Sequence, residues 1–334
     1  MCEMPLLLLA IIVVALLFDV TNGVHDSANA IATIVSTRVV TPQFAVSAAA
    51  VLNLVGALLG TEVAKTLGSG IVLPEMISGG QILVLAALLA AIFWNCTTWF
   101  FGIPSSSSHA LIGGLAGAAV ADAGFSALNY TGIVTKVLIP IILAPLLGFA
   151  AGFVCMWLVY WLFARFRRRR VTALFRRLQY CSASWIALSH GLNDAQKTMG
   201  VITLALFLFG FAESMDVPLW VTLACGSAMA LGTAMGGWKI VRTMGGRIFR
   251  IEPVHGFVAE SSAACVLTAA SLFGAPVSTT QTISSAIFGV GSTLRLSAVR
   301  WSLARTLITA WLLTLPAAGI AGFLCWHFLH FLTS

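Results

Sequence analysis

The chain has 334 residues, of which 59% are hydrophobic and 9% are charged, and its formal net charge is +7 at neutral pH. Because a soluble domain carries about 25% charged residues, this composition excludes an ordinary water-soluble protein. The apolar stretches are long rather than alternating, which excludes a β-barrel, and the basic residues lie between apolar blocks, which favours cytoplasmic membrane loops over nucleic acid binding.

Apolar segments follow one another along the whole chain. A membrane-spanning helix needs about 20 mostly apolar residues. In chain order the candidate segments are 5–40, 43–64, 81–101, 105–121, 133–164, 178–208, 218–237, 255–273, 277–292 and 301–329. Because Glu3 is the only early charge and no cleavage site is evident, we interpret the first segment as a helix and not as a signal peptide.

Two motifs occur twice in the chain. The run Gly23–Asn29 corresponds to Gly191–Lys197, and the run Gly102–His109 corresponds to Gly274–Gln281. Both motifs recur after an interval of about 170 residues, which indicates an internal repeat. An Arg-rich stretch lies between the copies. We therefore expect a first membrane repeat, a cytoplasmic linker and a second membrane repeat, at 1–164, 165–179 and 180–334.

The distribution of charge predicts that the second repeat is inverted. Each half holds five segments, an odd number, so the second half enters the membrane from the opposite side. Stretch 238–252 is strongly basic and its counterpart 65–80 is not, as inversion requires. With both termini outside, only Lys65, Lys136 and Lys197 lie off the cytoplasmic side. The predicted fold is an all-α, polytopic membrane protein with two inverted repeats and broken helices.

The first motif places ionisable residues inside apolar segments, where they are costly and usually mark a transport pathway. Gly23 and Gly191 are placed to let each helix unwind and expose carbonyl oxygens. Together with these carbonyls, four side chains offer oxygen ligands for a small cation or a proton site: Asp26, Asn29, Asn193 and Asp194. The alternative interpretation is a set of structural charges that pair with one another.

The second motif breaks the helix with Gly-x-Pro and continues with hydroxyl residues and a new helix. Helix N-termini present free N–H groups, which suit an anion. The alternative is an ordinary N-cap, but one cap needs only one residue. The connectors 102–104 and 274–276 are too short for surface loops, so we predict re-entrant hairpins at 81–121 and 255–292. Their tips would meet near the membrane midplane around one anion.

These motifs resemble those of the inorganic phosphate transporter (PiT) family of secondary carriers. The resemblance rests on Gly23–Ala30 and Gly191–Lys197, and on the Pro-x-Ser-Ser/Thr-Ser/Thr-His/Gln elements Pro104–His109 and Pro276–Gln281. It covers essentially the whole chain and is closest to the short bacterial, low-affinity branch. It implies phosphate import across the bacterial inner membrane by alternating access, driven by a symported proton or sodium ion.

The resemblance also implies roles for individual residues. The phosphate-binding set would be Ser106, Ser107, Ser108, Gln196, Lys197, Ser278, Thr279, Thr280 and Gln281. The coupling cation or proton would be held by His25, Asp26, Asn29, Asn193 and Asp194, with any sodium ion at Asp26, Asn29 and Asp194. Lys197 stands where sodium-coupled relatives tend to carry Asn, which favours protons.

No cofactor is expected. The expected partners are the lipid bilayer and phosphate, either free or as a divalent-metal complex, with a homodimer as a compatible assembly. Three alternatives to phosphate symport stay open from the sequence: a sulfate permease of the same family, an anion channel, and a membrane hydrolase that uses Ser106 and His109. The hydrolase is disfavoured because the second copy has Gln281 in place of the histidine, and glutamine cannot act as a base.

Overall fold

The computed structural model describes residues 3–73, 76 and 80–333, and this part of the chain is helical without a β-strand. The helices are α1 (Glu3–Ser36), α2 (Pro42–Ala57), α3 (Glu62–Gly70), α4 (Gly80–Phe101), α5 (Ser107–Ala123), α6 (Tyr130–Ile133), α7 (Ile139–Phe163), α8 (Arg168–Leu208), α9 (Leu219–Met235), α10 (Trp238–Gly246), α11 (Pro253–Leu272), α12 (Thr279–Leu294) and α13 (Trp301–Thr333). A π-helical segment, Val134–Leu138, joins α6 to α7. The all-α prediction is confirmed.

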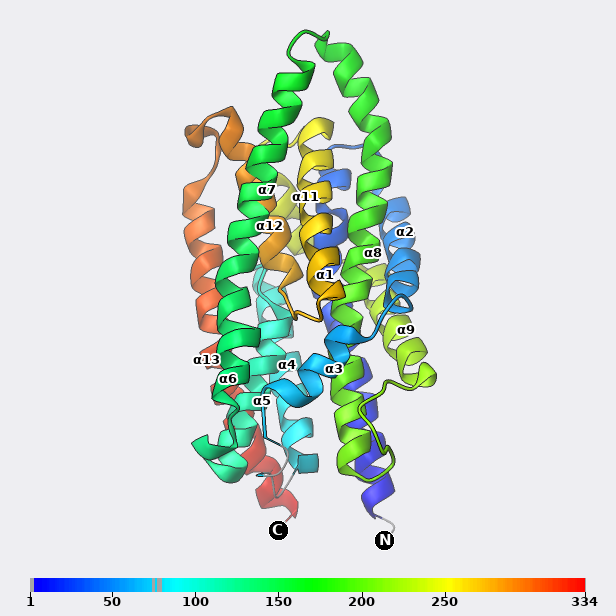
Figure 1. The fold of residues 1–334 in the computed structure, drawn as a ribbon, viewed down its shortest axis with the longest axis vertical. Coiled ribbons are helices and arrows are strands. Elements are labelled where there is room, and N and C mark those ends of the chain that lie inside the picture. Colours follow the sequence, from blue (N-terminus) through cyan, green and yellow to red (C-terminus); the bar gives the residue numbers. More distant parts are fainter. Residues whose placement is uncertain (1–2, 74–75, 77–79, 334) are drawn as a thin grey trace.

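Two helical hairpins enter the molecule from opposite ends. In Figure 1, α4 and α5 occupy the lower part of the bundle and α11 and α12 the upper part, and the two breaks meet near mid-height. Each break turns at a glycine with positive φ, Gly102 at 66° and Gly274 at 65°, a conformation that side chains with a Cβ rarely adopt. This arrangement is the one predicted for the re-entrant hairpins. The division of the chain into two inverted repeats stays a prediction.

The predicted unwinding at Gly23 and Gly191 is wrong. Both α1 and α8 are continuous helices through these positions. The glycines permit close helix packing instead: a Cβ on Gly23 would lie 2.4 Å from the Met229 carbonyl oxygen, and one on Gly191 would lie 2.1 Å from that of Asn53. The two glycines therefore let α9 and α2 approach the helices that carry the first motif.

Among the described residues, only some of the predicted spans are helices that are long and apolar enough to cross a membrane. Four are: Leu6–Ser36, Gly80–Phe101, Tyr130–Phe163 and Trp301–Leu332. The pair α9 and α10 is long and apolar enough to form one span bent by 71°, and the basic stretch 238–252 is helical over Trp238–Gly246. The hairpin helices α5 and α12 have 17 and 16 residues, which is too short to cross a bilayer alone.

The Arg-rich linker is helical from Arg168 onward, because α8 begins there and extends to Leu208. The turn between α7 and α8 lies at the end of the molecule opposite both termini (Figure 1). At the linker end, the Arg168 guanidinium lies 2.5 Å from a Glu252 carboxylate oxygen, and Arg176 donates to the Arg38 carbonyl at 3.1 Å. The linker is thereby attached to the ends of α1 and α11.

Two apolar cores leave a polar layer between them. One core gathers the first half of α1 with α4 and α5, and the other gathers the second half of α1 with α11 and α12. Between them lie buried polar side chains from both motif pairs. The breaks of the two hairpins are at this level, so the fold brings all four motif copies together.

Candidate functional site

Each hairpin tip begins with a helix cap. The Ser106 hydroxyl accepts a hydrogen bond from the His109 backbone N–H at 3.3 Å, and the Ser278 hydroxyl accepts one from the Gln281 N–H at the same distance. Both serines have extended backbones, as N-cap residues do. The ordinary capping interpretation therefore accounts for these two hydroxyls, and the hydroxyls that follow them remain for another use.

The next hydroxyls of both tips donate to two buried carboxylates. Ser107 and Thr280 donate to Asp26, at 2.8 and 3.2 Å. Thr279 donates to Asp194 at 2.8 Å. Asp26 comes from α1 and Asp194 from α8, so each carboxylate of the first motif is bound by hydroxyls of the second. Neither is more than 1% exposed.

The residues three positions after the two aspartates link the tips further. Asn29 donates from its amide nitrogen to Thr280 at 2.9 Å and to Thr279 at 3.2 Å. The Lys197 ammonium is paired with Asp194 and also donates to the Ser108 hydroxyl at 2.5 Å and the Val277 carbonyl at 3.2 Å. Because Ser108 and Val277 belong to different hairpins, Lys197 bridges the two tips.

A histidine accompanies each carboxylate. The Nδ1 of His25 lies 2.7 Å from Asp26 Oδ1, while its Nε2 lies 3.1 Å from the Thr98 hydroxyl on α4. The Nε2 of His190 lies 3.0 Å from Asp194 Oδ2. Each ring is thus held against one carboxylate, and the position of its proton decides whether it donates or accepts.

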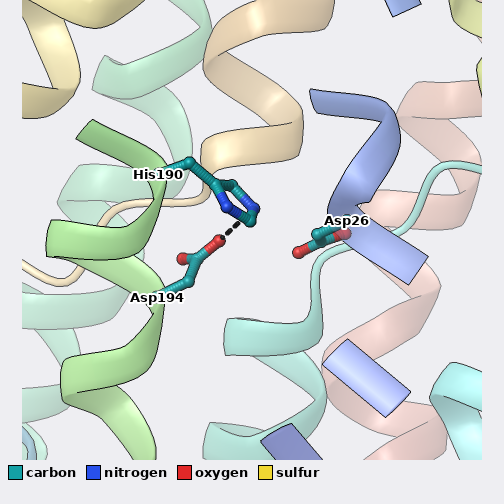
Figure 2. A group of neighbouring side chains, drawn as sticks. All are labelled: Asp26, His190 and Asp194. Carbon is teal, nitrogen blue, oxygen red and sulfur yellow. Dashed lines mark ion pairs between the residues drawn. The ribbon is translucent and has the colours of Figure 1, made fainter. Parts of the chain in front are cut away.

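Three groups approach closely enough to hold a small cation. One ligand atom each from Asp26, His190 and Asp194 lies within 4.8 Å of the others, and Figure 2 shows the side chains of α1 and α8 facing one another. The Asn29 amide oxygen is buried without a hydrogen-bond partner nearby. The carboxylate oxygens of Asp26 and Asp194 and the amide oxygen of Asn29 are the ligand type that a small hard cation prefers, and the carboxylates can also take a proton. Since Lys197 is already paired with Asp194, Asp26 is the carboxylate that such a cation would neutralise.

The structure does not bring every predicted residue to this centre. The Gln196 side-chain oxygen accepts from the Val63 N–H at 2.7 Å, at the start of α3, and the Asn193 amide donates to Ser271 at 2.9 Å. Because α8 turns about 100° per residue, these two side chains lie on a different face from Asp194 and Lys197, with Gln196 against α3 and Asn193 against the last turn of α11. Neither side chain contacts the hydroxyls of the tips in this structure, and the binding roles of Asn193 and Gln196 stay predictions.

Gln281 and His190 also differ from expectation. The Gln281 side chain lies in a cavity of about 600 Å³ between α7, α12 and α13, and its amide oxygen is buried without a partner. His190 is absent from the predicted cation set although it contacts Asp194. Its position four residues before that aspartate, on the same helix face, is the sequence signal that identifies it.

Comparisons with known proteins identify the family of the chain. A profile described as the phosphate transporter family matches residues 22–322. Proteins named probable low-affinity inorganic phosphate transporter are similar along nearly the full length: one from Rhizobium meliloti (strain 1021) is 50% identical and covers 96% of each chain. One from Bacillus subtilis (strain 168) is 46% identical and covers 97% of this chain and 98% of the relative.

A solved structure shares the fold. It is titled "The sodium-dependent phosphate transporter" and aligns with a TM-score of 0.90 at 22% identity, covering 97% of this chain and 99% of the other. At this identity the likeness establishes the architecture alone.

Proposed function

The chain belongs to the phosphate transporter family, and from that premise we propose that it imports inorganic phosphate by cation symport with alternating access. Its relatives are named as transporters, so it is a transporter and not an enzyme. The proposal concerns the direction of transport, the coupling and the residues that carry both.

The observation that supports coupling is the use of the tip hydroxyls. Ser107, Thr279 and Thr280 all donate to carboxylates, so none has its proton free for phosphate. A cation on Asp26 would replace the donated hydrogens there and release Ser107 and Thr280 to turn toward phosphate. Phosphate binding then depends on cation binding, which is what symport requires.

Charge supports the same order of events. Two carboxylates and one ammonium meet at the centre, and all three groups are buried. An oxyanion placed here meets excess negative charge, which is costly where water is excluded. Binding a cation at Asp26 balances that charge. Lys197 and the N-termini of α5 and α12 then provide the attraction for phosphate.

Alternating access needs an element that moves. Asp26 of α1 and Lys197 of α8 each bond to both hairpin tips, so closing around phosphate would draw the tips together. We expect the bilayer to be the bacterial inner membrane, with the Arg-rich end in the cytoplasm and both termini outside. Phosphate travels free or as a divalent-metal complex, and a homodimer is a compatible assembly.

Uptake of radiolabelled phosphate into proteoliposomes, under separately imposed pH and sodium gradients, tests the proposal. Asp26→Asn and Thr280→Ala should lower net uptake strongly. Thr309→Ala is the matched control, because that hydroxyl is exposed on α13 and bonds only to the Arg305 carbonyl of its own helix. Full uptake in both site variants at normal expression would refute the assignment.

Competition by unlabelled sulfate or unlabelled phosphate distinguishes a phosphate transporter from a sulfate permease. Phosphate carries an O–H donor at neutral pH and sulfate does not, and the carboxylates at the tips can accept from that donor. We therefore expect competition by phosphate and little by sulfate. Phosphate currents without any dependence on a cation gradient would indicate a channel instead.

A further inference from the structure

One face of α1 is polar and buried over the C-terminal half of the helix and the residue that follows it. Positions three and four residues apart share a helix face. On this face lie Asp19, Asn22, Asp26, Asn29, Thr33 and Thr37, none more than 9% exposed. At 1.5 Å per residue they extend over about 27 Å, close to the thickness of the hydrocarbon core. We call this the α1 seam.

The two ends of the α1 seam differ. Toward the N-terminus the same face continues with buried apolar side chains, among them Ile11, Ala15 and Phe18. At the other end, Thr37 lines a polar cavity of about 780 Å³ together with Arg38 and Arg250. The seam is thus closed by apolar residues at the end where both termini lie and reaches an open, basic cavity at the end of the linker.

Asp19 lies seven residues before Asp26, about 10 Å away along the axis. It is fully buried, and one carboxylate oxygen accepts a hydrogen bond from the Thr198 hydroxyl of α8. The other oxygen accepts no hydrogen bond from an N–H or O–H group, although the Cys225 thiol lies beside the carboxyl, and neither amide atom of Asn22, one turn further along the α1 seam, has a partner. Buried polar atoms of this kind are usually satisfied by ordered water or a ligand.

Glu260 of α11 lies at the corresponding distance on the other side. It contacts Thr33, seven residues after Asp26, and its carboxylate accepts from Thr33 and Ser182 at 2.5 Å and from Gln179 at 2.9 Å. It is also fully buried. Two carboxyl groups outside the phosphate site therefore flank it at about two helical turns, one on each side.

Neither carboxyl group has a cationic partner. Among residues 3–73, 76 and 80–333, no ion pair includes Asp19 or Glu260. A carboxylate without such a partner is costly in the interior and is stabilised by gaining a proton. Both Glu260 oxygens accept hydrogen bonds, Oε1 from Thr33 and Gln179 and Oε2 from Ser182 alone, so Oε2 keeps a lone pair that can take a proton.

The surroundings contain few other titratable groups. Asp19 faces Cys225 of α9 and, at longer range, Asp194 and Lys197 of α8, and α4 contributes no charged residue. Around Glu260, α1 and α8 present hydroxyl and amide groups, and the sequences of α7 and α12 carry no charge. Asp19 and Asp26 of the α1 seam, and Glu260 beside its other end, are therefore the natural proton acceptors along this route.

We propose that Asp19 and Glu260 hold the coupling proton on the outer and inner sides of the phosphate site, and that the α1 seam is its path. This inference rests on the proposed symport. A proton on the Asp19 carboxyl moves to the Asp26 carboxylate, with Asn22 offering a donor and an acceptor to water between them. After translocation it passes to the Glu260 carboxylate and leaves through the basic cavity. Only a proton moves, and no bond to phosphate changes.

The test compares net uptake with exchange in proteoliposomes. Net uptake driven by a pH gradient requires the proton to cross, whereas exchange of labelled for unlabelled phosphate at equal pH does not. Asp19→Asn and Glu260→Gln should each lower pH-driven uptake about tenfold or more while exchange stays within about twofold of wild type. Asp19→Glu keeps a carboxyl group and should retain pH-driven uptake. Glu213→Gln, at an exposed position, is the control.

The phosphate exchange assay shows whether the proton path or the proposed function itself is wrong. Equal loss of uptake and exchange in Asp19→Asn would show a structural role and overturn the inference, as would unchanged pH-driven uptake in both neutral variants. Wild-type uptake that follows a sodium gradient and ignores pH would overturn it while leaving phosphate symport intact. Wild-type protein with neither uptake nor exchange of phosphate would instead refute the proposed function.

Discussion

The two copies of the first motif sit on similar helices but differ in charge. In α1, Asp26 is followed three residues later by Asn29, a neutral side chain that donates to the hydroxyls of the second tip. In α8, Asp194 is followed at the same spacing by Lys197, which pairs with that aspartate and bridges the tips. One carboxylate is therefore paired with a lysine within the protein, whereas the other has only a histidine and hydroxyls beside it.

This difference assigns separate tasks to the two copies. A permanent ammonium beside Asp194 attracts phosphate whether or not a cation is bound. Asp26 has a histidine and hydroxyls around it but no contacting lysine or arginine among the described residues. In the proposed mechanism the α1 copy would therefore sense the coupling cation, and Lys197 of the α8 copy would contact the anion.

The largest effect should come from removing the charge of Asp26. In Asp26→Asn the carboxylate that exchanges the cation is gone, so we expect net phosphate uptake to fall by about a hundredfold or more. Asp194→Asn leaves Lys197 unpaired and should also fail, but mainly by misplacing the tips. Uptake and phosphate binding measured together separate the two, because only Asp194→Asn should lose binding.

The next largest effects should come from substitutions of Lys197, the residue in which the α8 copy differs from Asn29 of the α1 copy. Lys197→Met removes the bridge between Ser108 and Val277 and should lower uptake by about thirtyfold, through weaker phosphate binding. Lys197→Asn makes the α8 copy like the α1 copy and should raise the stimulation of uptake by sodium above that of wild type. Proteoliposome uptake with and without external sodium measures both. Sodium stimulation of equal size in wild type would contradict the assigned role of Lys197.

Substitutions of single hydroxyls should have smaller effects on phosphate affinity, and these should differ between the two hairpin tips. Thr280 links Asp26 to Asn29, whereas Ser107 contacts Asp26 alone. We expect Thr280→Val to lower the apparent phosphate affinity by about tenfold and Ser107→Ala by about threefold. Concentration series of uptake give both values. Equal losses would mean that the two tips contribute alike and would weaken the comparison.

The smallest effects should come from the caps, where the copies are equivalent. Ser106→Ala and Ser278→Ala each remove one hydrogen bond to the third residue of a helix and should cost about 1 kcal/mol of stability. Thermal unfolding of the purified protein measures this. Phosphate affinity should change little, and a loss as large as that of Thr280→Val would show that the cap hydroxyls bind substrate.

The repeated motifs allowed much of this arrangement to be predicted. Two motif pairs at one interval implied that the halves meet, and the Gly-x-Pro breaks implied hairpins with short connectors. Asp26, Asp194, Ser107 and Thr280 all lie where that reasoning places them. Hydroxyl residues after a Gly-x-Pro break are typical of helix N-termini, which present free N–H groups. Non-helical backbone at membrane depth is tolerated only where it is buried in protein or lines a cavity, so two such breaks indicate a site.

Other features depend on packing that the sequence does not display. Gly23 and Gly191 look like hinges, but the contacts that require a missing Cβ come from α9 and α2, far away along the chain. Asn193 and Gln196 belong to the motif yet face Ser271 and the start of α3. Which face of a buried helix meets which neighbour is decided by tertiary contacts, so adjacent motif residues can serve different purposes.

The central claim is that a cation on Asp26 releases the tip hydroxyls for phosphate. The most direct measurement is the phosphate affinity of purified wild type and Asp26→Asn over a series of pH values and sodium concentrations. The ionisation of phosphate changes with pH in the same way in both measurements. Any difference in pH dependence between the two proteins therefore comes from the Asp26 carboxylate. The account predicts affinity that rises with proton or sodium concentration in wild type and stays constant in Asp26→Asn. The same cation dependence in both proteins would contradict it.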